Sequence, residues 1–138
     1  MDLKISHKSK KCIGELKISG SKSETNRLLI LKALFSDFDI KNISNSDDSK
    51  TLEKALKSKE KIIDIHHAGT AMRFLTAYFS QLEGREVILT GSKRMQERPI
   101  KILVDSLISL GADIYYEKEI GFPPLRIKGK KIKGGSIK

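Results

Sequence analysis

The first group of residues that could do chemistry is a short polar segment that precedes an apolar run. It starts at Gly20 and Ser21 and carries Lys22, Ser23 and Arg27. Ser21 is a good helix N-cap, and the free N–H groups and the dipole at a helix start attract anions. Gly20 leaves room for a ligand to approach the main chain. The segment therefore predicts either an ordinary capped helix with solvated cations or part of an anion-binding site.

Two further glycine-containing turns lead into helix-like segments with arginine near their start. Residues 66–73 contain Gly69 and Arg73, and residues 89–100 contain Arg94 and Arg98. An arginine side chain offers a planar fork that binds a carboxylate or phosphate group at two points. If the three turns lie at the same edge of the fold, their arginines converge at a place that binds small polyanions.

The adjacent histidines, His66 and His67, invite interpretation as a metal site. Neighbouring residues on a strand point to opposite faces, so these two side chains cannot easily bind one ion. The sequence also has no carboxylate or third histidine at ligand spacing from them. We therefore expect no metal site.

The elements that must position these residues alternate between strand-like and helix-like patterns. Apolar spacing and capping residues predict helices at about 22–36, 49–57, 70–82 and 99–110. Strands are predicted twice within 2–19, then at 38–43, 61–66, 85–90, 112–116 and 125–127, with a last candidate at 135–138. This order favours an α/β fold with crossover connections. Because its apolar residues cover most of its circumference, the first helix is expected to be buried.

The charge of the chain favours anionic partners. Its 138 residues carry 27 Lys and Arg against 17 Asp and Glu, a formal net charge of +10. The partner could be a small phosphorylated metabolite, an acidic lipid or a nucleic acid. Nucleic acid is disfavoured because Phe74, Tyr78 and Phe79 fall on an apolar helix face instead of among the basic residues.

Cysteine content and hydropathy bear on the compartment. The single cysteine, Cys12, allows no internal disulfide and is expected to be a small buried residue. The sequence contains no apolar run of membrane-spanning length and no signal-peptide core near residue 1. We expect a cytoplasmic protein without membrane association.

Taken together, the three turns resemble a known family. Gly20-Ser21-Lys22-Ser23 with Asn26-Arg27, Ala68-Gly69-Thr70-Ala71-Met72-Arg73, and Leu89-Thr90-Gly91 with Arg94-Met95 and Glu97-Arg98-Pro99-Ile100 are similar to motifs of the 5-enolpyruvylshikimate-3-phosphate synthases. The motifs occur in the family's order and span nearly the whole chain. The resemblance implies part of the inside-out α/β barrel of the enolpyruvyl transferases.

The resemblance also implies an activity and residue roles. The family transfers an enolpyruvyl group from phosphoenolpyruvate to shikimate 3-phosphate, in the shikimate pathway of aromatic amino-acid synthesis, and needs no metal or organic cofactor. By this resemblance Lys22 contacts both substrates at the reacting hydroxyl, and Ser23 with Arg27 holds shikimate 3-phosphate. The Gly69 backbone and Arg94 bind phosphoenolpyruvate. His67 and Thr70 are further candidate site residues.

The chain departs from the family pattern in two respects. His67 stands where the family usually has asparagine, and the chain resembles only roughly the first third of the family's protein. The resemblance places residues 1–19 with the second domain and makes residues 20–138 an incomplete N-terminal domain. We therefore expect a fragment that is inactive alone, with residues 1–19 disordered, folded back, or paired with another copy of the chain. The alternative is a stand-alone phosphometabolite-binding module without catalysis.

Overall fold

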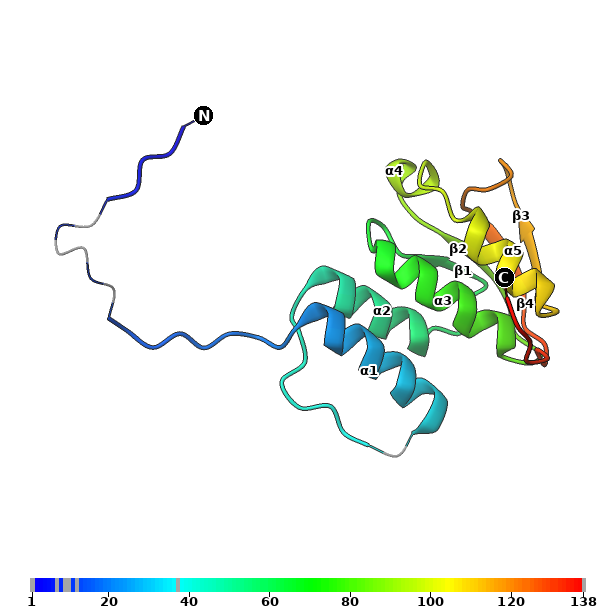
Figure 1. Cartoon of the computed structure of the whole chain (residues 1–138), viewed down its shortest axis with the longest axis horizontal. Coiled ribbons are helices and arrows are strands. Elements are labelled where there is room, and N and C mark those ends of the chain that lie inside the picture. The colour runs from blue at the N-terminus through cyan, green and yellow to red at the C-terminus, as the bar shows by residue number, and fades with distance from the viewer. Residues whose placement is uncertain (1, 7, 9–10, 12, 37, 138) are drawn as a thin grey trace.

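The computed structural model describes residues 2–6, 8, 11, 13–36 and 38–137. Figure 1 shows an α/β body from which an extended N-terminal arm projects. Here "the arm" means the described residues among 2–19. Cys12 and part of the lysine-rich turn at 8–11 lie outside the described residues, so their predicted structure is not tested.

The body contains helices and strands in the order α-α-β-α-β-α-α-β-β. The helices are α1 (Lys22–Phe35), α2 (Asp47–Lys57), α3 (Gly69–Gln81), α4 (Lys93–Gln96) and α5 (Lys101–Ser109). The strands are β1 (Ile62–Asp64), β2 (Glu86–Thr90), β3 (Asp113–Tyr116) and β4 (Leu125–Lys128).

The four strands form one mixed sheet in the order β1-β2-β4-β3. β1 and β2 are parallel because α3 carries the chain across between them, and Ile63 is paired with Leu89. β4 is antiparallel to both of its neighbours. The parallel pair matters most for function, since the loops that follow β1 and β2 leave the sheet at the same edge.

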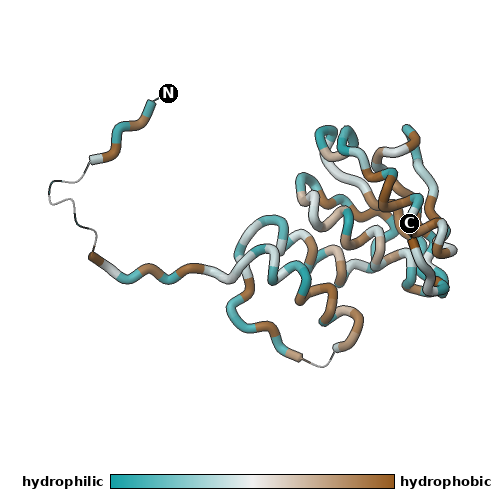
Figure 2. Tube along the Cα trace, viewed as in Figure 1, coloured by the Kyte–Doolittle hydropathy of each residue, from teal (hydrophilic) through white to brown (hydrophobic). Residues whose placement is uncertain are grey.

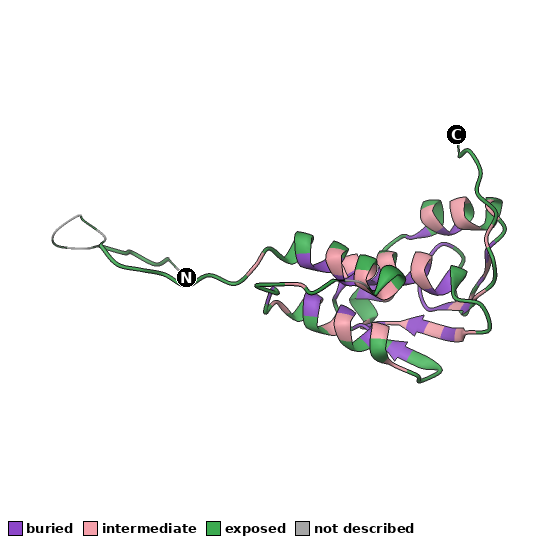
Figure 3. Cartoon of the chain, turned by 90° about the horizontal axis from the view of Figure 1, so that it is seen from below, coloured by how far each residue is buried: buried purple, intermediate pink, exposed green. Residues whose placement is uncertain are grey.

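A single hydrophobic core joins the helices to one face of the sheet. Along β2 and β4 buried residues alternate with half-buried ones, which is the pattern of a strand covered on one face. Figure 3 shows the buried residues on the inner sides of the helices and along the strands. The fully buried core side chains include Leu52, Ile65, Leu75, Phe79, Val87, Leu89, Val104, Leu125 and Ile127. Burying each side chain of this size contributes about 1.5–3 kcal/mol before the loss of conformational entropy.

The other face of the sheet carries charged side chains. Arg126 donates two hydrogen bonds to Glu117, at 2.7 and 3.2 Å, and one to Glu86 at 3.2 Å. The Lys61 ammonium lies 3.4 Å from Glu86 and its charge lowers the pKa of that carboxyl. The hydrogen bond from Arg126 lowers the pKa of Glu117. These groups form a solvated ion-pair network that joins β2 and β4 to the residue before β1 and the residue after β3.

Three of the predicted strand regions are wrong. The described part of 2–19 and the segment 38–43 contain no strand, and neither does 135–137. Leu3, Ile5 and Ile13 are 78%, 93% and 95% exposed, so the arm does not fold back on the body. A period-two apolar pattern forms a strand only where a neighbouring strand accepts its hydrogen bonds. None of these segments is paired with a strand among the described residues.

The prediction of a buried first helix is also wrong. α1 packs on α2 and α3 through one face, which buries Leu29. Leu31, Leu34 and Phe35 on its remaining surface are 43%, 42% and 65% exposed. Figure 2 shows that the second half of α1 is rich in apolar residues. Apolar composition alone cannot say which neighbours are present to cover a helix.

The remaining elements agree with the sequence to within a few residues. Serine side chains cap three helix starts: Ser21 accepts from the Glu24 N–H at 3.4 Å, and Ser46 accepts from the Ser49 N–H at 3.3 Å. The third cap precedes α4, a four-residue helix that the sequence did not predict. α2 begins two residues earlier than expected because Ser46, before Asp47, is its cap.

Candidate anion-binding site

The turns after β1 and β2 meet at one edge of the sheet. The Ser92 N–H donates to the His66 carbonyl at 3.1 Å, and the Ile65 N–H donates to the Thr90 carbonyl at 3.0 Å. Gly91 is buried between them, and a Cβ on it would lie 2.7 Å from the His66 oxygen. The second and third turns of the sequence analysis are therefore joined through their main chains.

His66 and His67 have different roles in this junction. His66 has a left-handed backbone, with φ of 48°, and its N–H donates to Asp64 at 2.7 Å. That bend turns the chain so that Nδ1 of His67 lies 2.9 Å from the Ser92 hydroxyl oxygen. Among the described residues, no group of three or more His, Cys, Asp and Glu side chains is arranged to hold a metal ion.

A hollow of about 580 Å³ lies beside this junction, lined by His67, Arg94, Met95 and Arg98. We call it the arginine hollow. Both arginines are exposed at its wall, and Met95 is buried at its base. Two guanidinium groups and an imidazole lining one open hollow suit it to an anionic group.

The arginines of the hollow differ from the other four in the sequence. Arg27 is held by the Ser23 carbonyl, Arg73 by the Pro99 carbonyl, Arg85 by main-chain carbonyls before β1, and Arg126 by two glutamates. Within the described residues, the guanidinium groups of Arg94 and Arg98 have neither a hydrogen-bond nor an ion-pair partner. Among the described residues, the only two arginines whose side chains have no protein partner thus line the same hollow.

Gly69, the first residue of α3, lies directly against one of these arginines. A Cβ on Gly69 would overlap Nη1 of Arg98 and would lie 3.1 Å from its Cζ. Thr70 follows in the first turn of α3 and is half-buried. Among the predicted site residues, Gly69, His67 and Arg94 are therefore brought to one place.

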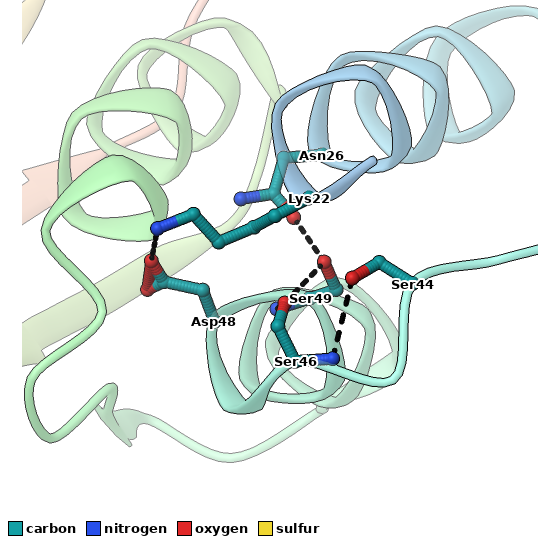
Figure 4. Close-up of polar contacts among 6 residues, drawn as sticks. All are labelled: Lys22, Asn26, Ser44, Ser46, Asp48 and Ser49. Carbon is teal, nitrogen blue, oxygen red and sulfur yellow. Dashed lines mark hydrogen bonds and ion pairs between the residues drawn. The ribbon is translucent and has the colours of Figure 1, made fainter. Parts of the chain in front are cut away.

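Lys22 is paired with a residue that lines a second, adjacent hollow. Its ammonium forms an ion pair of 3.0 Å with Asp48, at the start of α2, as Figure 4 shows. Asp48 helps to line a hollow of about 520 Å³ that also touches His66 and His67. Because His67 lines both hollows, it links the Lys22–Asp48 pair to the arginine hollow.

A buried hydrogen-bond network fixes the relative position of α1 and α2 beneath Lys22. The Ser49 hydroxyl donates to Asn26 Oδ1 at 2.8 Å and accepts from the Ser46 hydroxyl at 3.0 Å (Figure 4). Asn26 is fully buried, and its Nδ2 has no hydrogen-bond partner among the described residues. The network orients the first turn of α1, from which Lys22 projects.

Arg27 and Ser23 are not brought into either hollow. Arg27 donates to the Ser23 carbonyl of its own helix at 2.8 Å, and its guanidinium carbon lies 5.9 Å from the centre of the Phe74 ring. It borders a separate, largely apolar depression of about 420 Å³ between α1 and α3. Gly20 also differs from expectation, because a Cβ on it would overlap the Asn42 carbonyl. The room beside this glycine is occupied by the chain itself and not by a ligand.

Sequence reasoning missed several residues that shape the site. It gave no role to Ser92 and no binding role to Asp48, and it counted Arg98 among the arginines near a helix start without assigning it a substrate contact. A serine immediately before a short cationic segment was the only signal for the α4 cap. Nothing in the sequence pairs Asp48 with Lys22, since 26 positions separate them.

Comparisons with known proteins identify the relatives of this chain. The family whose model matches residues 50–138 is described as EPSP synthase (3-phosphoshikimate 1-carboxyvinyltransferase). A 3-phosphoshikimate 1-carboxyvinyltransferase of Bacteroides fragilis is 50% identical over 123 residues, which are 88% of this chain and 30% of the relative. The corresponding protein of Buchnera aphidicola is 45% identical and is matched over 90% of this chain and 34% of its own length. The chain thus spans about a third of the length of these relatives.

The fold is also similar to a solved structure. EPSP synthase from Acinetobacter baumannii superposes with a TM-score of 0.74 at 20% sequence identity, over 90% of this chain and 34% of that protein. This likeness places the described elements in the inside-out α/β fold. None of the described helices is long and apolar enough to cross a membrane. Because the family match spans most of the α/β body and the Bacteroides relative shares half of the aligned residues, the chain belongs to the EPSP synthase (3-phosphoshikimate 1-carboxyvinyltransferase) family.

Proposed function

We propose that this chain forms part of the substrate site of an enzyme that transfers an enolpyruvyl group from phosphoenolpyruvate to shikimate 3-phosphate. The observation that carries the proposal is the arginine hollow, where two arginines without protein partners line one space with His67. Both substrates bear phosphate and carboxylate groups, which fixed guanidinium groups bind without reorganisation.

In this proposal phosphoenolpyruvate occupies the arginine hollow. Arg94 supplies a two-point contact to one of its anionic groups, and the N–H of Gly69 at the start of α3 adds a main-chain donor. His67 and Thr70 border this position. The parallel strands β1 and β2 hold the two turns, so the cations are in place before the ligand arrives.

Lys22, Ser23 and Arg27 bind shikimate 3-phosphate in the same proposal. Lys22 must exchange Asp48 for the substrate, and its half-exposed side chain leaves it free to turn toward a ligand. Arg27 must leave the Ser23 carbonyl, and its long side chain on the exposed surface of α1 can do so. In this arrangement Lys22 also lies at the reacting hydroxyl and acts as the catalytic cation.

The proposal divides the chain into two parts. Residues 20–138 belong to the N-terminal substrate-binding domain, and residues 1–19 belong to the second domain. Positioning by Lys22, Arg27 and Arg94 does not move a proton, so we propose that proton-transfer carboxylates come from outside this chain. The 138 residues alone are then inactive. The complete enzyme would work in the cytoplasm without a metal or organic cofactor.

The arm supports a proposal of self-association. Leu16 and Ile18 are 90% and 78% exposed and flank a lysine, as Leu3 and Ile5 do. Within the described sheet, the outer edges of β1 and β3 have no neighbouring strand. An alternating apolar segment can add to such an edge in another copy of the chain.

Reconstitution tests the proposed function. Phosphate release is assayed with both substrates, first with the 138-residue chain and then with the remaining two thirds of the Bacteroides fragilis relative added. Turnover is expected only in the mixture. Turnover by the chain alone would overturn the proposed inactivity, and saturable binding of shikimate 3-phosphate without turnover in the mixture would favour a stand-alone binding module.

A further inference from the structure

Arg98 has no assigned role in the proposed function, yet its guanidinium group is closely placed. Nη2 of Arg98 lies 3.3 Å, and Cζ lies 3.1 Å, from the point where a Cβ on Gly69 would stand. The group therefore rests on the bare main chain at the start of α3. Any residue larger than glycine at position 69 would push the guanidinium away.

The main chain at Arg98 is fixed from both sides. Its N–H donates to the Met95 carbonyl at 3.1 Å, which closes the turn after α4. Two residues later Ile100 is buried, and its N–H donates to the Gly121 carbonyl at 2.8 Å. The side chain thus starts from a defined position and ends on Gly69.

No carboxylate among the described residues neutralises the charge of Arg98. It shares the arginine hollow with Arg94, and neither guanidinium has an ion-pair partner among the described residues. Two like charges beside one space repel each other, whereas an anion between them is attracted by both. The other arginines of this chain donate hydrogen bonds to carbonyl or carboxylate oxygens. The absence of such partners for Arg94 and Arg98 among the described residues therefore indicates a ligand position.

We infer that Arg98 is a second anion-binding arginine of the hollow and that Gly69 is a positioning residue whose missing side chain seats the Arg98 guanidinium. The inference rests on the proposed function and deepens it. The ligand group is a phosphate or carboxylate held between Arg94 and Arg98. Gly69 then acts through Arg98 as well as through its own N–H.

A titration with inorganic phosphate tests the inference on the 138-residue chain. Chemical shifts of the 15N-labelled chain give both the dissociation constant and a check that each variant is folded. Arg98→Ala is expected to weaken phosphate binding by about threefold to tenfold, the effect of losing one charge-assisted hydrogen bond at a partly exposed site. Gly69→Ala is expected to weaken it by a similar factor, because the methyl group displaces Arg98.

The double variant Gly69→Ala with Arg98→Ala shows whether Gly69 acts by positioning the Arg98 guanidinium or by contacting the anion itself. If Gly69 acts by seating Arg98, Gly69→Ala causes little further loss once Arg98→Ala is present. Gly134→Ala and Lys54→Ala are matched controls, because a Cβ on Gly134 meets nothing within 4 Å and Lys54 is exposed on α2. Both are expected to bind phosphate like the parent chain.

The outcomes distinguish this inference from the proposed function. Weaker binding in Arg94→Ala with unchanged binding in Arg98→Ala would overturn the inference and leave the proposed function standing. A full loss from Gly69→Ala in the Arg98→Ala background would overturn the seating role. A parent chain that shows no saturable phosphate response would contradict both.

Discussion

The Nδ1 atom of His67 lies 2.9 Å from the Ser92 hydroxyl oxygen, which joins two turns that 25 positions separate in the sequence. The same hydroxyl oxygen accepts the Met95 N–H at 3.3 Å and caps α4. One serine therefore holds the His67 ring and begins the short helix that carries Arg94. The geometry of the arginine hollow depends on this residue.

Ser92→Ala is expected to destabilise the chain by about 1–2 kcal/mol, because it removes a helix cap together with a side-chain hydrogen bond. Urea unfolding followed by circular dichroism measures the change. Ser136→Ala in the exposed C-terminal tail is the matched control and should leave the free energy of unfolding unchanged. Equal midpoints for both variants would contradict the role given to Ser92.

The sequence predicted the parts of the site that depend on local pattern. The caps, the glycine turns and the arginines near helix starts are local features, and β1 parallel to β2 follows from the helix between them. The Lys22–Asp48 pair, the seat of Arg98 on Gly69 and the separation of Arg27 from the hollow depend on how distant elements pack. Single-sequence periodicity carries no information on such contacts.

The fold was predicted in the same uneven way. Apart from α4, the helices and strands from α2 to β4 were predicted to within a few residues, because each has an apolar face that the described core covers. The arm, the segment 38–43 and the outer face of α1 were predicted from apolar residues as well. In the described residues, however, these apolar side chains have no covering surface.

Asn26→Ala is expected to destabilise the chain by about 1–3 kcal/mol, since it removes the buried acceptor of the Ser49 hydroxyl and leaves a small cavity between α1 and α2. The unpaired Nδ2 of Asn26 reduces the loss, because that group is already unsatisfied. Urea unfolding again gives the value. Asn45→Ala, at an exposed position, is the control, and a loss no greater than that of the control would show that the network contributes nothing.

Arg94→Lys tests the division of the substrate contacts. Residues 1–138 are joined to the remaining part of the Bacteroides fragilis relative, and Michaelis constants are measured for both substrates. A lysine keeps the charge but lacks the two-point fork, so catalytic efficiency toward phosphoenolpyruvate should fall by roughly ten- to hundredfold, equivalent to about 1.5–3 kcal/mol. The Michaelis constant for shikimate 3-phosphate should change little.

Arg27→Ala in the same chimera is the complementary variant. It should raise the Michaelis constant for shikimate 3-phosphate and spare the phosphoenolpyruvate side. An equal effect of both variants on both substrates would contradict the separate roles. An unchanged constant for shikimate 3-phosphate in Arg27→Ala would remove Arg27 from the proposed site and agree with its position against Phe74.

The ion-pair network on the sheet predicts a pH dependence of stability. Hydrogen bonding from Arg126 lowers the pKa of Glu117 in the folded chain, so this carboxylate stabilises the fold above its unfolded pKa. That contribution is lost as the pH falls through the lowered pKa. Urea midpoints measured from pH 7 to pH 3 should therefore fall less steeply in Glu117→Gln than in the parent chain. Glu83→Gln, at an exposed position, should keep the parent slope, and parallel curves for all three chains would contradict the prediction.

Removal of residues 2–19 is expected to abolish self-association without unfolding the body. The apolar side chains of the arm are exposed and can therefore contact another copy of the chain. The described body from α1 to β4 packs its core without them. Figure 3 shows the arm exposed along its described length.

Sedimentation velocity over a range of concentrations should show reversible dimers for the whole chain and monomers for residues 20–138. Replacing Ile5 and Ile18 together by lysine should have the same effect as the deletion, since charge in place of two exposed apolar side chains opposes the addition of the arm to a sheet edge. Lys4→Ala with Lys17→Ala is the control and should leave the dimers in place. A whole chain that stays monomeric at the highest concentration, or a deletion that still dimerises, would show that the arm does not link two copies.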